Sequence, residues 1–166
     1  MNSHQRLLGI KDLAIELEDT VQLHREIAWT SLNTAWWHNK FNEEAQKRLA
    51  QLGRRLLSLI IRYVTEPSKR EETIGLARDV GHGFGETLAQ LGLPLTDSVE
   101  AFILHRHPIM NAATNLIRKK EALTGRVVEA IPLVAQVMDE ALVSLVAAHQ
   151  QYRDSFQSES KGGDLA

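Results

Sequence analysis

Arg106 is the charged residue whose place in the sequence is hardest to explain by exposure to solvent. It lies four residues after Phe102 and three before Ile109, so helical spacing puts it on an apolar face. A buried guanidinium without a partner is strongly unfavourable. Arg106 therefore needs a carboxylate, backbone carbonyls or an anionic ligand close by.

Two histidines occupy similar positions, because His24 and His149 also fall in phase with apolar residues three and four positions away. Together with Arg106 they could converge on one internal site. Alternatively, each is satisfied separately by hydrogen bonds, or the arginine side chain extends to the protein edge. The candidate ligand-binding residues are His24, Phe102, His105, Arg106, His149 and Tyr152.

The other histidine and glycine motifs do not match known catalytic or cofactor signatures. The run Gly81-His82-Gly83-Phe84-Gly85 lies inside a helical pattern, whereas a dinucleotide loop follows a strand and opens a helix. His105 and His107 are two residues apart, which separates their side chains by about 160–200° on a helix, too far to share one metal. The sequence has no nucleophile-elbow pattern. We therefore expect no enzyme activity, no catalytic residues, no metal and no cofactor.

The composition is that of one globular domain. A chain of 166 residues is long enough to bury a core without cross-links, and the lack of cysteine excludes disulfides and thiolate chemistry. With 19 basic and 21 acidic residues the net charge is −2, which argues against non-specific nucleic-acid binding. Uninterrupted apolar runs are short, and the N-terminus lacks a signal-peptide pattern. We expect a cytoplasmic protein that binds neither nucleic acid nor membrane.

Apolar residues recur every three or four positions along the chain, which is typical of amphipathic helices, and no alternating strand pattern is present. The expected fold is an all-α, single-domain bundle of about five helices over residues 1–158, with a flexible polar tail at 159–166. A globin-like packing is one candidate arrangement for such a bundle.

This pattern is interrupted by residues that typically begin or end helices. The third helix is expected to open with a capping box, a serine followed three residues later by a glutamate. Gly92 suits the residue after the end of that helix, and Pro94 prevents its continuation. The other expected boundary residues are Asn42 and Pro67 for the second helix, Ser68 and Glu71 for the third, Thr96 or Asp97 for the fourth, and Pro132 for the last.

Small residues are concentrated in the third helix, where glycine costs about 0.5–1 kcal/mol relative to alanine. A chain that keeps four glycines there is expected to use some of them for close approach of backbones. One face carries a small residue every four positions, and we call this set the small-residue ridge: Ala77, Gly81, Gly85 and Ala89. The ridge is predicted to be a helix-packing surface.

A few apolar residues lie away from the main stripes, namely Leu104 in the fourth helix and Val143 and Ala147 in the last. Apolar residues on a second helix face suggest a partner helix. The simplest partner is a second copy of this chain, so we expect a homodimer.

The central stretch resembles the N-terminal domains of bacterial stressosome co-antagonist proteins of the RsbR and RsbRD type. The similar elements are Gly81 to Gln90, the corner Leu91-Gly92-Leu93-Pro94-Leu95, the helix from Ala101-Phe102 to Arg106, and the closing helix VAQVMDEALVSLVAAHQQY. The resemblance covers about residues 5 to 155. It implies a helical, often dimeric input module that normally precedes an output domain, and it gives no catalytic role to Phe102 or Arg106.

No such output domain follows the last helix, so we expect a stand-alone relative or part of a longer protein. The leading hypothesis is a non-enzymatic sensory or protein-interaction domain of bacterial signal transduction, which acts as a helical dimer. A signal would bias helix packing near the small-residue ridge, and a downstream signalling protein or output domain would respond. The alternative is a small-ligand or haem-type binding protein with an internal His/Arg pocket.

Overall fold

The computed structural model describes Ile15, residues 40–104 and residues 124–162, and within these ranges the regular elements are all helical. Helix α2 spans Glu43–Thr65, a short 3-10 helix η2 spans Pro67–Lys69, and α3 spans Arg70–Gln90. Residues 95–104 are helical, and α5 spans Thr124–Gly162. The described residues contain no strand, so the predicted all-α class is confirmed. The count of five helices and a globin-like packing remain predictions.

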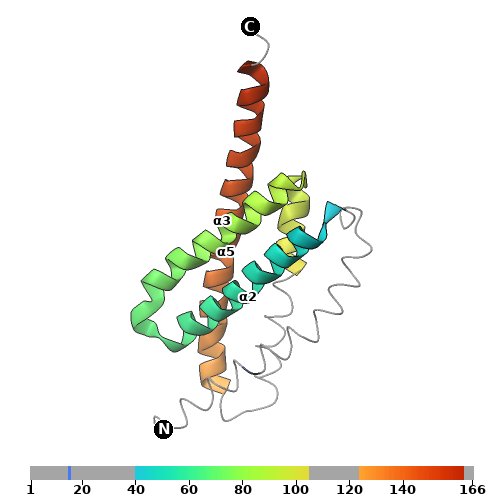
Figure 1. The fold of residues 1–166 in the computed structure, drawn as a ribbon. Helices are drawn as coiled ribbons and strands as arrows, with labels where there is room; N and C mark the ends of the chain where they lie inside the picture. Colours follow the sequence, from blue (N-terminus) through green and yellow to red (C-terminus); the bar gives the residue numbers. More distant parts are fainter. Residues whose placement is uncertain (1–14, 16–39, 105–123, 163–166) are drawn as a thin grey trace.

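Helices α2 and α3 form a hairpin, and α5 crosses it (Figure 1). The contacts of α5 are mainly with α3, and it also touches α2. The C-terminal end of α5 projects beyond the other described helices (Figure 1). Only the N-terminal part of this helix therefore has a face covered by the bundle.

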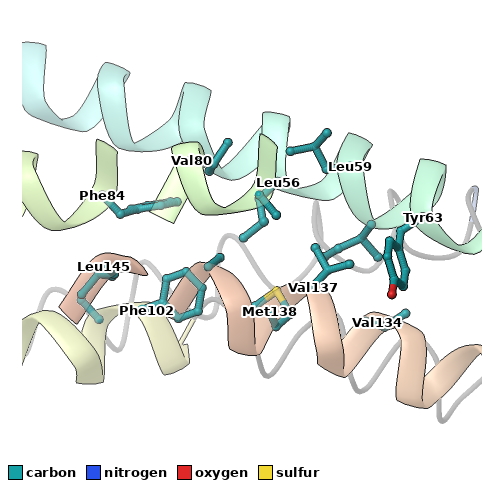
Figure 2. Close-up of a cluster of buried hydrophobic side chains, with 14 of the residues drawn as sticks. Leu56, Leu59, Tyr63, Val80, Phe84, Phe102, Val134, Val137, Met138 and Leu145 are labelled. Atoms are coloured by element: carbon teal, nitrogen blue, oxygen red, sulfur yellow. The ribbon is translucent and has the colours of Figure 1, made fainter. Parts of the chain in front are cut away.

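One hydrophobic core lies between these helices (Figure 2). Each large apolar side chain that is fully buried stabilises the fold by about 1.5–3 kcal/mol. The rings of Phe84 in α3 and Phe102 in helix 95–104 meet edge to face, with centroids 5.7 Å apart. At the opposite end of the core, the Tyr63 hydroxyl donates a hydrogen bond of 2.9 Å to the Gln136 side chain.

The two ends of α2 lie where the sequence predicts them. The Asn42 side chain accepts a hydrogen bond of 2.8 Å from the backbone N–H of Ala45, which caps the helix. The helix ends at Thr65, two residues before Pro67. Both boundary predictions are confirmed.

The predicted capping box at Ser68 is wrong. Ser68 lies inside η2, and the residue that precedes α3 is Lys69, whose side chain makes no capping hydrogen bond. Pro67 begins a tight turn in which the Lys69 N–H bonds to the Glu66 carbonyl at 3.0 Å. Ser68 is part of this turn and cannot cap the α-helix that follows. The serine–glutamate spacing alone therefore did not locate the cap.

Gly92 ends α3 as predicted. It adopts a φ of 74°, in the left-handed region, and its N–H bonds to the Ala89 carbonyl at 2.9 Å. The Leu93 N–H bonds to the Leu88 carbonyl at 3.2 Å. This pair of hydrogen bonds is a Schellman motif, which satisfies two carbonyls at the helix end and turns the chain away.

The fourth helix begins earlier than expected. Residue 95 is already helical, and the Pro94 carbonyl accepts the first hydrogen bond, from the Ser98 N–H at 3.0 Å. Thr96 and Asp97 therefore lie within the first turn, and neither is the cap.

Side-chain burial corrects which residues of the fourth helix face the core. Ser98, Ala101 and Phe102 are buried, and helical phase then carries Ile103 to the opposite side, where it is 36% exposed. Leu104 packs against the core instead of pointing away from it. The sequence had placed Leu104 on the outer face, and that prediction is wrong.

Helix α5 is longer than the sequence predicts, because it begins at Thr124 and passes through Pro132. Proline removes one backbone hydrogen bond. Here Pro132 is exposed, while Ala130 and Val134 on either side are buried and hold both segments against the core. At the other end the helix continues through residues 159–162 of the predicted tail. The domain limits stay a prediction.

Within the described part of the chain, one segment, Glu129–Ser160, is long and apolar enough to cross a membrane by length and composition alone. Of its most apolar window, 33% is buried inside the protein. Glu140, which lies within this segment, pairs with Arg78 of α3.

We predict that Gly92→Ala lowers the free energy of unfolding by about 1–2 kcal/mol, because alanine disfavours the left-handed conformation. The matched control is Gly53→Ala in α2, where an added Cβ meets nothing within 4 Å. The control should raise stability by about 0.5–1 kcal/mol. Urea denaturation of both variants measures the difference, and equal effects would contradict a positive φ at Gly92.

Candidate functional site

The two glycines of the small-residue ridge lie against the backbone of α5. Ala77, Gly81, Gly85 and Ala89 are all buried. A Cβ atom added to Gly81 would clash with the Ala141 carbonyl and lie 2.8 Å from its carbon atom. A Cβ added to Gly85 would clash with the Leu145 carbonyl in the same way. The α3 and α5 backbones therefore touch at two points, with no side chain between them.

The two contact points define how the helices fit together. Gly81 and Gly85 are four residues apart on α3, and Ala141 and Leu145 are four residues apart on α5. Residues with this spacing lie on the same face of a helix, about one turn apart. A slide of one helix along the other would move both glycines away from their matching carbonyls, so the contact fixes the register.

Polar groups of α3 and α5 interact with each other beside this contact. Arg78 Nε lies 2.8 Å from Glu140 Oε2, and the Ser144 hydroxyl donates a hydrogen bond of 2.6 Å to the Arg78 carbonyl. The hydrogen bond and the charge of Glu140 raise the pKa of Arg78 above its ordinary value. Because the pair is exposed, it orients the two helices more than it stabilises them.

The motif Gly81-His82-Gly83-Phe84-Gly85 lies wholly within α3 and forms no loop. His82 is exposed, with its Nδ1 3.8 Å from Glu86. A Cβ added to Gly83 would lie 3.1 Å from a Leu52 methyl group, so this glycine packs against α2. The three glycines of the motif thus serve helix packing on two sides.

His149 is fully buried where the corner after α3 meets α5. Its Nε2 lies 2.7 Å from the Leu93 carbonyl oxygen. A carbonyl oxygen can only accept, so Nε2 must carry the proton. The Schellman turn at Gly92 directs the chain that presents this carbonyl, and the histidine ties the turn to α5.

The second ring nitrogen of His149 has no such partner. Nδ1 is buried and has no hydrogen-bond partner among the residues that the structure describes. With the proton on Nε2, a neutral ring leaves a bare lone pair on Nδ1. Buried polar atoms are nearly always paired, so this atom calls for a donor from a water molecule or a ligand.

A groove of about 240 Å³ opens beside His149, between α5 and the start of helix 95–104. Leu95 contributes one apolar wall, and the rest comes from one side of α5. The lining residues on α5 are His149, Gln150, Arg153, Asp154 and Gln157. Most of the lining residues are therefore polar, and they include one positive and one negative charge.

The structure describes three of the six candidate ligand-binding residues and places them in different surroundings. His149 lines the groove, whereas Phe102 is part of the apolar core. Tyr152 lies half-buried on α5, with its ring 5.2 Å from that of Phe156. His24, His105 and Arg106 lie outside the described residues, so convergence of Arg106 with the two histidines stays a prediction.

Sequence reasoning did not find the rest of the groove. Arg153 and Asp154 are ordinary charged residues near the end of a helix, and no spacing rule singles them out. The Leu93 backbone carbonyl gives no sequence signal at all. The only indication was His149 in phase with Leu145, which marked a buried histidine but not its partner.

The described residues contain no group of three or more His, Cys, Asp or Glu side chains that could hold a metal ion. Comparison of the chain with protein-family models, curated proteins and solved structures finds no match. The arguments that follow therefore rest on the geometry of this chain.

We predict that Gly81→Ala lowers the free energy of unfolding by about 1–3 kcal/mol, because the added methyl group forces the two backbones apart. Gly75→Ala is the matched control on the same helix, since nothing lies within 4 Å of its added Cβ. The control should be stabilising by about 0.5–1 kcal/mol. Thermal and urea unfolding test this, and an unchanged Gly81→Ala variant would rule out the backbone contact.

We also predict that His149→Phe lowers the free energy of unfolding by about 1–3 kcal/mol, because the Leu93 carbonyl loses its donor. His82→Phe on the exposed side of α3 is the control and should change stability by no more than about 0.5 kcal/mol. Urea denaturation compares the two variants. Similar losses in both would show that the buried hydrogen bond does not matter.

Proposed function

We propose that this chain is a non-enzymatic sensory or protein-interaction domain that acts as a homodimer. The observation that supports this proposal best is the direct contact of α3 with α5, together with the continuation of α5 past the bundle (Figure 1). A change in the bundle that alters the register or tilt of α5 is carried along that helix to its projecting end.

The length of α5 suits such a role. Its 39 residues span about 58 Å at the rise of an α-helix. Residues up to His149 have a face in the core, whereas residues 151–160 are exposed except for the half-buried Tyr152. A downstream signalling protein or an output domain would bind or follow this projecting part.

The outer face of α5 is the proposed dimer surface. Val143 is 68% exposed, and Ala147, one turn further along, is exposed on the same face. Both residues point away from the core stripe, as their spacing predicts. Leu104 no longer contributes to this surface because it packs inward. Pairing of α5 with the same helix of a second copy would bury both residues on a two-fold axis.

A cytoplasmic, bacterial signalling role is part of the same proposal. It is supported by the resemblance of the ridge, the Gly-Leu-Pro corner and the closing helix to stressosome input domains. It also agrees with the ion pair of Glu140 in mid-helix, since a charged residue is costly in a lipid bilayer.

The alternative function, binding of a small molecule, is favoured by the groove beside His149. A haem-type role for His149 is not favoured by the same geometry. Nε2 is already bonded to Leu93, and Nδ1 is buried, so neither nitrogen is open to an iron atom.

We predict that the native chain has twice the mass of the 18.7 kDa monomer in solution, and that Val143→Lys/Ala147→Lys gives the monomer mass. Two lysines on the paired faces would meet their copies and repel them. Gln51→Lys/Gln90→Lys, on exposed positions of α2 and α3, is the control and should remain dimeric. Light scattering after size exclusion measures the mass, and a monomeric native chain would refute the dimer.

A further inference from the structure

The basic residues of α2 all lie on one side of the helix. Residues 45–65 contain five basic residues and no acidic one. At about 3.6 residues per turn they fall within an arc of about 120°, away from the side that is buried in the core. All are exposed except the half-buried arginine nearest the C-terminal end. We call this set the basic face: Lys47, Arg48, Arg54, Arg55 and Arg62.

The central part of the basic face has no acidic neighbour. No residue three or four positions from Arg54 or Arg55 is acidic, so neither has an ion-pair partner at helical spacing. Neither they nor Arg48 form an ion pair with another residue in the described part of the chain. The helix dipole favours basic residues in the last turn, and these three lie well before it. Local pairing and the helix dipole therefore leave this positive charge unexplained.

The charge of the basic face is opposite to that of the rest of the chain. Without these five residues the chain has 14 basic and 21 acidic residues, a net charge of −7. A long polyanion that extends beyond α2 would be repelled by this negative charge. A short acidic segment avoids the repulsion, because the face is only about 22 Å long from Lys47 to Arg62.

The residue types on this side of α2 favour protein carboxylates over other anions. Four of the five basic residues are arginines, whose planar guanidinium binds a carboxylate through two parallel hydrogen bonds. The other residues within the arc are Gln51 and Ser58, so bases of a nucleic acid have no aromatic ring there to stack on. The apolar side of α2 is buried in the core, which leaves the helix without the apolar face that enters a membrane surface.

We propose that the basic face binds an acidic helix of a partner protein, with a carboxylate every three or four positions. Arg48 and Arg55 are seven residues apart, which is two helical turns. A partner helix that lies along α2 has the same pitch, so its carboxylates stay in step with the arginines. This surface goes beyond the proposed homodimer, because it lies on α2 and does not include the exposed apolar residues of α5.

The test is a titration of the full chain with a labelled helical peptide of glutamate and alanine. The peptide carries one glutamate for each residue of the basic face, spaced by three or four positions, and fluorescence anisotropy measures its binding. We expect a dissociation constant on the order of 100 µM at low salt, the most that exposed ion pairs of this number allow. Raising the salt to about 0.5 M should weaken binding at least tenfold, because salt screens exposed charges.

Three variants show whether binding depends on the basic face. Arg54→Gln/Arg55→Gln should weaken peptide binding about tenfold, since it removes two ion pairs. Arg153→Glu changes the net charge equally at an exposed position of α5 and should bind as the native chain does. Gln51→Lys adds a positive charge within the arc and should tighten binding about threefold, a gain that misfolding cannot produce.

A thymidine oligonucleotide and phosphatidylserine vesicles at matched negative charge are the competing probes, and both should bind more weakly than the peptide. The inference is overturned by a lack of saturable peptide binding, by equal weakening in Arg153→Glu, or by tighter binding of either competing probe. Light scattering on the same samples reports the dimer separately. A dimer that does not bind the peptide contradicts this inference alone, and a monomer that binds it contradicts the dimer alone.

Discussion

The contact between the α3 and α5 backbones at Gly81 and Gly85 is the constraint on which the arrangement of the helices depends. Where side chains interdigitate, two helices can often repack around a changed residue. Where a carbonyl lies against a glycine Cα, no side chain can adjust, so position and register are fixed together. The ion pair of Arg78 with Glu140 lies beside this contact, as does the hydrogen bond from Ser144 to the Arg78 carbonyl. Both orient the same two helices.

The same contact shows what the sequence could and could not predict. Glycines at intervals of four are unfavourable in a helix, so their presence at Gly81 and Gly85 pointed to close packing before any partner was known. Which helix would fill the gap has no sequence signal, because the groups that approach are backbone carbonyls of Ala141 and Leu145. Backbone atoms are identical at every position, and only the folded chain identifies the pair.

Helix boundaries were predicted well where one side chain decides them and poorly where two signals compete. Asn42 and Gly92 each meet a local requirement, a cap acceptor and a left-handed φ. Ser68 follows a proline that starts its own 3-10 turn, and the turn prevails over the capping box. Pro132 was read as a start because proline breaks isolated helices, yet buried neighbours on both sides keep α5 continuous.

Most of the groove could not be predicted from the sequence for a related reason. His149 was found because a polar residue in an apolar stripe is unusual, whereas its partner is the Leu93 carbonyl. That carbonyl follows Gly92, so the end of α3, the buried histidine and the groove form one mechanical unit. They lie where α5 leaves the bundle, next to its contact with Gly85. A change at this corner would therefore act on α5 at the point from which its projecting end extends.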